Sequence, residues 1–484
     1  SGTEEIKGWY VVNPSDFARD GSATDIWYAS NWQGLVNYFN EDRRDIYNPN
    51  GPISNQLFNL RYENGSIYML QGGFDEVLTP TFKWGAFSNF EEGEWKTTYP
   101  NSNNVPNFQD LVSVTFDKAK NTLFFASSWN GIVAKKDEQY YFINDQTEKC
   151  RLFNTTFGVR VQDVFYDDFQ EVTWVCNQVG DQGRSPSIHK IKNNNECESY
   201  YFEAKEALFP VQIITDNGNN KWIRGSIGKA GGGLFVFNEA KKIGETPVFK
   251  ILKEGVASGN LPSNAVNCMV KDRNGDIWVG TGKGIAVYYS PDNITETTNP
   301  SAVTPIFGNF PLLFDQVVTA IDVDGGNRKW IGTSNGIYLF NPDGTRVIHY
   351  FNKENSPLIS NSIVSIKVNQ KTGEVFIGTD LGIVSYRESA TLGNDDTKEV
   401  IVFPNPVKTN YAGEIGFSGL ATDAIVKVTD ISGRLVFEAQ ANGGGASWNG
   451  RDYNGKKISA GVYVILTSKS DGSSAVAGKL FVVD

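Results

Sequence analysis

Residues 266–288 read VNCMVKDRNGDIWVGTGKGIAVY, and the same pattern returns twice further along the chain. Residues 318–340 read VTAIDVDGGNRKWIGTSNGIYLF, and residues 364–386 read VSIKVNQKTGEVFIGTDLGIVSY. A looser copy covers residues 211–237. Each copy is too short to bury its own apolar face, so the copies must pack on one another. The repeat therefore indicates an array of similar units.

One copy divides naturally into strands and turns. Residues 318–323 alternate apolar and polar side chains, as a strand with one buried face does. A turn cluster follows at residues 324–327, and short apolar runs at 330–332 and 337–340 predict a second and a third strand. Residues 346–351 supply a fourth strand. Four short antiparallel strands per unit are typical of a β-propeller blade.

An aromatic residue marks the second strand of each expected blade. These residues are Trp27, Tyr68, Phe125, Trp174, Trp222, Trp278, Trp330 and Phe376. Because blades of this class take about 40–50 residues, the signatures predict an all-β fold with a seven- or eight-bladed β-propeller. Since the rings recur at one position of the blade, we interpret them as packing between blades and not as ligands.

The first of these signatures, at Trp27, has no clear four-strand frame around it. Two alternatives follow. Either a strand at residues 9–13 joins the last blade and closes the ring, or the signature is left over from a preceding propeller.

The composition of the chain changes near residue 389. Residues 389–398 are polar, with one Gly and two Asp, and predict a linker. Beyond them, alternating segments separated by Gly and Asn turns predict a small immunoglobulin-like β-sandwich. The predicted domains are a propeller at residues 3–388, the linker, and a C-terminal sandwich at residues 399–484.

The charge balance and hydropathy exclude several classes of protein. The chain has 484 residues, with 44 Lys and Arg against 55 Asp and Glu, a formal net charge of −11. Nucleic-acid-binding domains normally present a basic face, so we expect no nucleic-acid partner. No run of about 18 apolar residues occurs, so we expect no transmembrane segment. No signal peptide is visible, and Ser1-Gly2 in place of an initiator Met fits a processed end.

The four cysteines, Cys150, Cys176, Cys197 and Cys268, include no CxxC pair, so we expect neither a bound metal nor a cofactor. Free buried cysteines are the favoured interpretation. A bridge between Cys176 and Cys197 is the alternative.

Residues suited to catalysis are scarce. His189 and His349 are the only histidines, they fall in different blades, and no nucleophile motif accompanies them. Residues 272–276 (DRNGD) resemble the start of a calcium loop, but no Glu follows at the required distance and a similar turn recurs at 324–327. We therefore predict a hairpin turn, no catalytic residue, no metal site and no enzymatic activity. A carboxylate-pair glycosidase or lyase stays open, because many Asp and Glu are present.

The turns after the second strands are the candidates for ligand binding. Two of them contain a tryptophan, Trp32 or Trp129, and two are long, one with Arg184 and the other with Arg224 and Lys229. Exposed indoles suit sugars, and a guanidinium group binds phosphate or carboxylate through two parallel hydrogen bonds. We hypothesise that these residues form a ligand surface on one face of the propeller. The alternative is that both indoles tuck under neighbouring loops.

Four motifs follow one another in the C-terminal segment. They are Phe403-Pro404-Asn405-Pro406, Asp430-Ile431-Ser432-Gly433-Arg434-Leu435-Val436, Gly461-Val462-Tyr463-Val464 and Lys479-Leu480-Phe481-Val482-Val483. Together they resemble the C-terminal sorting domain of type IX secretion. The resemblance implies a protein exported by a Gram-negative bacterium to its cell surface, outer membrane or periplasm. The alternative is an ordinary sandwich without an address function.

The repeats resemble the two-component-regulator-type propeller repeats of hybrid sensors, above all at residues 277–281 (IWVGT) and 330–333 (WIGT). Such a propeller followed by a sorting-like domain resembles the PorZ-like surface proteins of the type IX secretion system. That resemblance implies a non-enzymatic binding or scaffold component of the attachment machinery, with outer-membrane secretion proteins and anionic surface lipopolysaccharide as partners. The alternative function is a ligand-sensing ectodomain or a glycan-processing enzyme on a propeller scaffold. That family carries two propellers and one is evident here, so the chain is either a piece of such a protein or a single-propeller relative.

Overall fold

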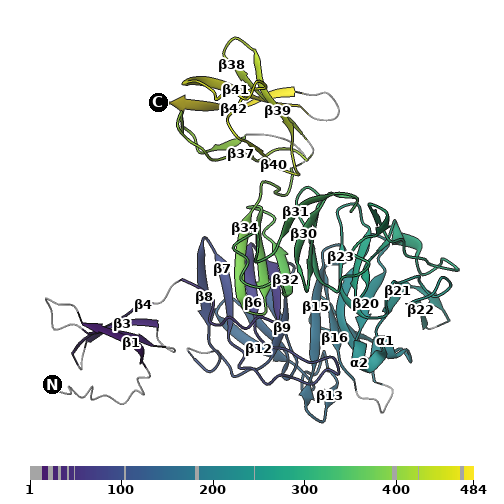
Figure 1. Ribbon diagram of the computed structural model, residues 1–484. Helices are drawn as coiled ribbons and strands as arrows, with labels where there is room; N and C mark the ends of the chain where they lie inside the picture. The colour runs from purple at the N-terminus through teal and green to yellow at the C-terminus, as the bar shows by residue number, and fades with distance from the viewer. Residues whose placement is uncertain are drawn as a thin grey trace.

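The chain is built almost entirely from short antiparallel strands, arranged as a ring of sheets, a two-sheet sandwich and a small separate sheet (Figure 1). The computed structural model describes residues 14–19, 26–30, 34–40, 43–47, 50–102, 105–179, 185–244, 246–394, 400–422, 424–468 and 474–484. In this described part, no helix combines the length and the hydropathy that crossing a membrane requires.

Seven sheets of the described chain form the ring, one for each blade. The first blade comprises β5 (Asn59–Glu63), β6 (Ser66–Leu70), β7 (Phe87–Glu91) and β8 (Glu94–Thr98). The second comprises β9 (Leu111–Asp117), β10 (Thr122–Ser127), β11 (Gly131–Lys136) and β12 (Gln139–Ile143). The third comprises β15 (Val161–Asp167), β16 (Val172–Asn177), β17 (Ile188–Ile191) and β18 (Cys197–Tyr200). The fourth comprises β19 (Pro210–Thr215), β20 (Lys221–Gly225), β21 (Leu234–Ile243) and β22 (Thr246–Leu252).

The last three blades contain the clearest repeats of the sequence. The fifth comprises β23 (Val266–Lys271), β24 (Ile277–Thr281) and β25 (Gly284–Tyr288). The sixth comprises β28 (Val318–Val323), β29 (Lys329–Thr333), β30 (Gly336–Phe340) and β31 (Val347–Phe351). The seventh comprises β32 (Ile363–Val368), β33 (Glu374–Thr379) and β34 (Gly382–Arg387). Short elements between blades are β13 (Asn154–Thr155), β14 (Gly158–Val159), β26 (Ile306–Phe307), β27 (Phe310–Pro311), α1 (Lys205–Leu208) and a 3₁₀ turn at Pro291–Asn293. The short helix α2 (Ile227–Ala230) lies inside the fourth blade, between β20 and β21.

The ring closes between the seventh blade and the first. The backbone N–H of Leu60 in β5 donates to Oγ of Ser365 in β32 at 3.0 Å. Further out, the rings of Phe376 and Phe90 lie 5.0 Å apart. The propeller is therefore seven-bladed, which is the smaller of the two predicted numbers.

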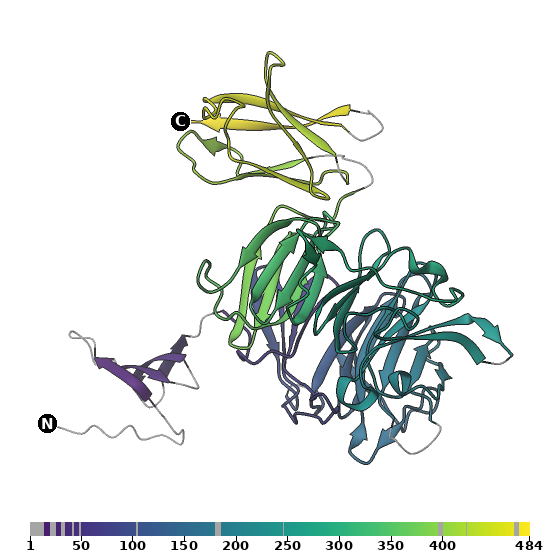
Figure 2. The ribbon, with the colours of Figure 1, turned by 45° about the vertical axis from the view of Figure 1, so that its right-hand side comes forward.

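The signature at Trp27 lies in a sheet outside the ring. This sheet contains β1 (Pro14–Arg19), β2 (Ile26–Ser30), β3 (Gly34–Asn40) and β4 (Arg43–Tyr47) in sequential order. It lies apart from the propeller in both ribbon views (Figures 1 and 2). The predicted propeller domain of residues 3–388 thus contains this sheet as well as the ring. The predicted closing strand at residues 9–13 lies outside the described residues.

In the ring, the aromatic residues of the second strands fill the interfaces between blades, as predicted, whereas Trp27 lies on β2 of the separate sheet. Trp222, Trp278 and Trp330 are at most 1% exposed. Trp222 packs on Tyr288 of the next blade, with 5.1 Å between ring centroids, and Trp330 packs on Tyr386 at 6.0 Å. Because each ring removes about 150–250 Å² from water, these residues hold adjacent blades together.

The calcium-like segment at residues 272–276 is the hairpin turn between β23 and β24, as expected. Oδ1 of Asp272 accepts from the backbone N–H groups of Asn274 and Asp276 at 2.9 and 3.0 Å. Its Oδ2 accepts from Nζ of Lys329 at 2.7 Å and from Nε1 of Trp278 at 3.2 Å. The carboxylate thus accepts hydrogen bonds both from the backbone of its own turn and from Lys329 of the next blade.

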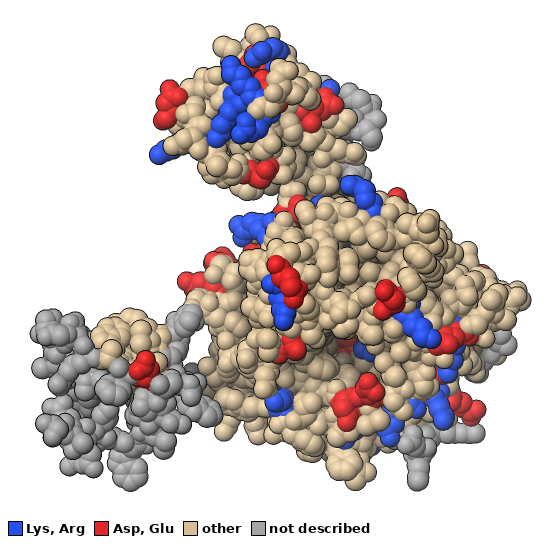
Figure 3. Space-filling view, in the orientation of Figure 1, with Lys and Arg blue, Asp and Glu red and all other residues tan. Residues whose placement is uncertain are grey.

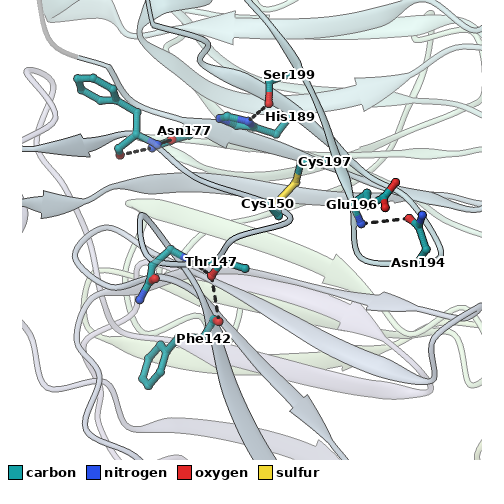
Figure 4. The surroundings of a disulfide bond; sticks show 11 residues. Phe142, Thr147, Cys150, Asn177, His189, Asn194, Glu196, Cys197 and Ser199 are labelled. Carbon is teal, nitrogen blue, oxygen red and sulfur yellow. Dashed lines mark hydrogen bonds between the residues drawn. A yellow bond between two sulfur atoms is a disulfide. The ribbon is translucent and has the colours of Figure 1, made fainter.

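A disulfide joins Cys150, in the loop after β12, to Cys197 at the start of β18 (Figure 4). The two Cα atoms are 4.6 Å apart. The favoured expectation of free cysteines is therefore wrong for this pair, and so is the alternative bridge from Cys197 to Cys176. Cys176 lies on β16 inside the third blade and is buried and free, and Cys268 is free as well.

The C-terminal domain is a two-sheet sandwich and fits the predicted immunoglobulin-like arrangement. One sheet contains β35 (Ile401–Phe403), β37 (Ile415–Ser418) and β40 (Gly445–Trp448). The other contains β36 (Val407–Lys408), β42 (Ser474–Val483), β41 (Gly461–Ser468), β38 (Ile425–Asp430) and β39 (Leu435–Gln440). Trp448, stacked on Phe437 at 5.1 Å, belongs to the apolar core between the sheets.

The sorting motifs lie at structurally defined places in the sandwich. Pro404 and Pro406 follow cis peptide bonds. Asn405 between them reaches the last strand, because its side chain accepts from Phe481 N–H and donates to the carbonyl of Lys479, both at 2.9 Å. Tyr463 is buried and donates its hydroxyl to the carbonyl of Ser459 at 3.0 Å.

The remaining motif forms the turn between β38 and β39. Gly433 has a φ of +85°, a conformation that favours glycine. Nε of Arg434 donates to Oδ2 of Asp430 at 3.1 Å. Hydrogen bonds from Ser432 and Arg434 lower the pKa of the Asp430 carboxyl to about 2.

Candidate functional site

The innermost strands of the blades are joined around the central channel by polar side chains. Asn59, Gln212, Asn267 and Thr319 each donate a side-chain hydrogen bond to a carbonyl of the next innermost strand, at 2.6–3.0 Å. Backbone ladders cannot form between separate blades, so these bonds replace them. The channel wall is consequently polar.

Asp163 of β15 joins four blades at one point. Its Oδ1 accepts from the Arg61 guanidinium at 2.6 Å and from Oγ of Ser113 at 2.5 Å. Its Oδ2 accepts from the backbone N–H of Ile213 at 2.9 Å. The carboxylate is 1% exposed, so this pairing compensates its desolvation.

A cavity of about 160 Å³ occupies the channel near the beginnings of the innermost strands. We call it the upper cavity. Its polar lining includes Arg61, Gln162, Arg224, Asn267 and Lys367. A volume of this size holds about five water molecules. The upper cavity is therefore large enough for a small polar ligand.

A second cavity of about 310 Å³, the lower cavity, adjoins it towards the other end of the channel. Both cavities share Arg61, Gln212, Met269 and Lys367 as lining residues. In the lower cavity, Nζ of Lys367 pairs with Asp322 at 2.8 Å. Burial raises the pKa of the Glu63 carboxyl to about 7, although Glu63 accepts from the backbone N–H of Phe116 at 3.0 Å.

A long loop between β6 and β7, residues 71–86, crosses the end of the channel next to the upper cavity; we call it the strap. The buried carboxylate of Asp110 anchors it by accepting from Thr81 Oγ1 at 2.8 Å and from Phe82 N–H at 2.7 Å. The carbonyl of Glu76 accepts from Oγ of Ser226, and the carbonyl of Leu78 accepts from Arg160, at 2.7 and 3.0 Å.

The strap has apolar contacts as well as polar ones. Leu78 is buried in an apolar cluster with Phe209, Val211 and Ala230 of the fourth blade. Phe74 of the strap lines the upper cavity. The first blade therefore reaches across the second and third blades to the fourth and covers this end of the channel.

The predicted site residues do not all meet. Trp129 is half-buried, and its ring lies 5.2 Å from that of Phe82 in the strap. Lys229 is exposed on α2, with Nζ 6.0 Å from the Phe209 ring. Arg224 points into the channel and lines the upper cavity. Trp32 and Arg184 lie outside the described residues. The structure thus places Trp129 and the 226–233 loop beside the strap, and Arg224 beneath it.

Sequence reasoning did not identify Arg61, Gln162 or the strap. A signal for the strap was present in the spacing of 57 residues between Tyr68 and Phe125, the longest between neighbouring signatures. Arg61 and Gln162 lie on innermost strands of different blades, so only the closed ring brings them together.

The two histidines lie away from the channel. His189 on β17 is fully buried and bonded through Nδ1 to Oγ of Ser199 at 2.8 Å (Figure 4). Burial lowers its pKa to about 4, so it is neutral near pH 7. Nε2 of His349 on β31 lies 3.7 Å from the Glu388 carboxylate. Within the described ranges, no group of three or more His, Cys, Asp or Glu is arranged to hold a metal ion.

The surface of the propeller carries both signs of charge. On the face drawn in Figure 3, acidic and basic side chains are interspersed over the ring, whereas Lys and Arg gather on the sandwich. On that face the propeller has no extended field of one sign.

Two family models match parts of the chain. Residues 401–482 match the secretion system C-terminal sorting domain, and residues 260–283 match the two component regulator propeller. The first match contains the four motifs of the sandwich except the final Val483, and the second contains β23 and β24. No curated protein matches the chain significantly.

Solved structures share the fold of the whole chain. PorZ of Porphyromonas gingivalis, a surface component of its type IX secretion system, has a TM-score of 0.67 at 21% identity over 97% of this chain. The extracellular domain of BT4673 from B. thetaiotaomicron has a TM-score of 0.50 at 14% identity over 97% of this chain. The chain spans 65% of the length of the PorZ structure and 63% of that of BT4673. This chain is therefore PorZ-like in fold, carries a two component regulator propeller repeat, and ends in a sorting domain that marks it as an exported protein.

Proposed function

We propose that this chain is a non-enzymatic binding and scaffold component of the type IX secretion attachment machinery. In this proposal the protein sits at the surface of a Gram-negative cell beside outer-membrane secretion proteins. Its propeller recognises an anionic surface glycan such as lipopolysaccharide. The observation that carries the proposal is the union, in one chain, of a PorZ-like propeller and a secretion system C-terminal sorting domain.

The chemistry of the described residues supports binding over catalysis. The buried His189 is hydrogen-bonded to Ser199, and it is not among the residues that line either cavity. In the channel, Asp163 and Asp322 are each engaged by a cation and by a backbone N–H group. Polar groups fixed in this way suit recognition, because they are preorganised and need no proton transfer.

Deletion of residues 400–484 tests the assignment in the bacterium that makes the protein. The ring closes on itself without the sandwich, so we expect a folded propeller that no longer reaches the cell surface. Protease digestion of intact and lysed cells measures its location. A truncated protein found at the surface in the same amount as the full chain would refute the sorting role.

Affinity isolation of the full chain tests the partners. We expect outer-membrane secretion proteins to be recovered with it from detergent extracts. Release of reducing sugar from surface polysaccharide by the purified full chain would instead assign it to the glycan-processing enzymes.

A further inference from the structure

The upper cavity contains a cationic side chain without a counter-charge. Arg61 is paired with Asp163 at 2.6 Å, and Lys367 is paired with Asp322 at 2.8 Å. Arg224 enters the same cavity from β20. Across the described ranges it has no carboxylate within ion-pair distance, and burial lowers the pKa of its guanidinium. The cavity therefore has an unneutralised positive charge.

Hydrogen-bonding groups in this cavity are also incompletely satisfied. The Arg224 guanidinium donates to the carbonyl of Val266 at a long 3.4 Å, and its buried Nε has no partner in the described structure. Nε of Arg61 and Oε1 of Gln162 are likewise buried without a partner in that part of the chain. Gln162 is only 2% exposed. Two donors and one acceptor are thus available, and buried groups of this kind require partners.

We infer that the upper cavity binds a small hydroxylated anion, whose carboxylate or phosphate pairs with Arg224 and whose hydroxyl group donates to Gln162. A guanidinium group holds such an anion through two parallel hydrogen bonds. The cavity of about 160 Å³ accommodates a single sugar acid or sugar phosphate. The strap covers one end, and the adjoining lower cavity offers the way in from the other. This inference deepens the proposed function and rests on it, because it places the recognition of an anionic sugar inside the channel. The binding measurements below do not depend on export, so the inference and the sorting role can fail separately.

Isothermal titration of the purified full chain tests the site. The probes are D-glucuronate, glucose 6-phosphate, inorganic phosphate and, as a neutral control, glucose. We expect the first two to bind more tightly than inorganic phosphate, and glucose to show no heat of binding. Preference between glucuronate and glucose 6-phosphate distinguishes the carboxylate from the phosphate.

Variants locate the binding in the channel. Arg224→Gln keeps a donor for the Val266 carbonyl but removes the charge, and we expect at least tenfold weaker binding of the charged sugars. Gln162→Leu should weaken the charged sugars but not inorganic phosphate. Arg346→Gln is the matched control, since Arg346 is exposed at the β30–β31 turn. It should bind as the unaltered chain does.

Thermal unfolding distinguishes a loss of binding from a loss of folding in the Arg224→Gln variant. The charged sugars should raise the Tm of the unaltered chain but not that of Arg224→Gln. Without ligand, the variant should melt no lower than the unaltered chain, since an unpaired buried cation has been removed. Failure of every charged probe to bind the unaltered chain would overturn the inference. So would equal binding by Arg224→Gln, or binding of glucose as tight as that of the charged sugars.

Discussion

A turn of the propeller and a turn of the sandwich share the pattern Asp-x-Asn/Ser-Gly but have different surroundings. Residues 272–276 read DRNGD and residues 430–434 read DISGR. In both, Oδ1 of the first Asp accepts from the backbone N–H groups two and four residues later, at 2.9–3.1 Å. The second oxygen of Asp272 accepts from buried groups of the ring, whereas in the described part of the chain that of Asp430 accepts from the exposed Arg434.

The difference shows what local sequence does and does not determine. The Asp-x-Asn/Ser-Gly pattern specifies the turn, because the side chain caps its own backbone. Burial decides the role of the turn. Asp272 connects two blades, whereas Asp430 leaves a charged turn at the surface of the sorting domain, where a partner can reach it.

Removing Asp272 should have the largest effect on stability. Asp272→Ala leaves the fully buried ammonium of Lys329 without its carboxylate, and breaking a buried pair costs about 3–5 kcal/mol. The matched control is Asp452→Ala, because Asp452 accepts from Asn454 and Lys456 N–H in a turn of the same kind in the sandwich. It should lose less than about 1 kcal/mol. Urea unfolding followed by tryptophan fluorescence measures both, and equal losses would contradict the comparison.

Reduction of the disulfide should affect the ring and spare the sandwich. The bond joins the second and third blades across a sequence separation of 47 residues, and opening such a loop costs about 2–4 kcal/mol. All four cysteines precede residue 269, so the sandwich offers no target. We expect a reductant, or a Cys150→Ser and Cys197→Ser double variant, to lower only the propeller transition in a calorimetric scan. A matching fall in the sandwich transition would be unexpected.

Acid should weaken the two regions at different pH values. In the folded state the pKa of His189 is near 4, below the ordinary 6.5. The contribution of the neutral imidazole to the free energy of unfolding is therefore complete above pH 6.5 and is lost as the pH falls towards 4. The loss is about 3 kcal/mol. The pKa of Asp430 is lowered to about 2, so the turn in the sandwich should weaken only as the pH falls below about 3.8.

Glu63 complicates this pH window, because its raised pKa of about 7 makes stability fall as the pH rises from 4.5. The variant His189→Gln separates the contribution of His189 to the free energy of unfolding from that of Glu63. The difference in unfolding free energy between this variant and the unaltered chain should shift in the variant's favour as the pH falls from 6.5 to 4. A constant difference over that range would rule out a neutral buried histidine.

The smallest effect on stability should come from the turn at Asp430. Asp430→Ala and Asp452→Ala each remove one exposed carboxylate, and both should cost less than about 1 kcal/mol. If the 430–434 turn is part of the sorting signal, only Asp430→Ala should reduce the amount of protein at the cell surface. Surface labelling of intact cells measures this amount, and equal reductions would place the signal elsewhere in the sandwich.

Much of the fold could be predicted from local sequence patterns, whereas the contacts between residues far apart in the sequence could not. The second-strand aromatics, such as Trp222 and Trp330, identified the blades because each repeats one packing position. The pairing of Arg61 with Asp163 joins the first and third blades across the channel. Which blades face each other depends on their number, and the sequence left that number at seven or eight.

The pairing of the cysteines was predicted wrongly for a related reason. Cys176 and Cys197 lie in one blade, but Cys176 is buried on β16, whereas Cys150 meets Cys197 across a blade boundary. Of the candidate site, Arg224 was identified because the sequence placed it at the start of a long turn, but it lies in strand β20. That its side chain points into the channel could be seen only from the structure of the closed ring.

A reporter protein shows whether the sandwich alone supplies the export address, leaving the propeller to recognise a ligand. A fluorescent protein carrying an export signal and residues 389–484 is expressed in the bacterium that makes this chain, beside the same protein without those residues. We expect only the first fusion to become accessible to protease on intact cells. Retention of both fusions inside the outer membrane would contradict this expectation.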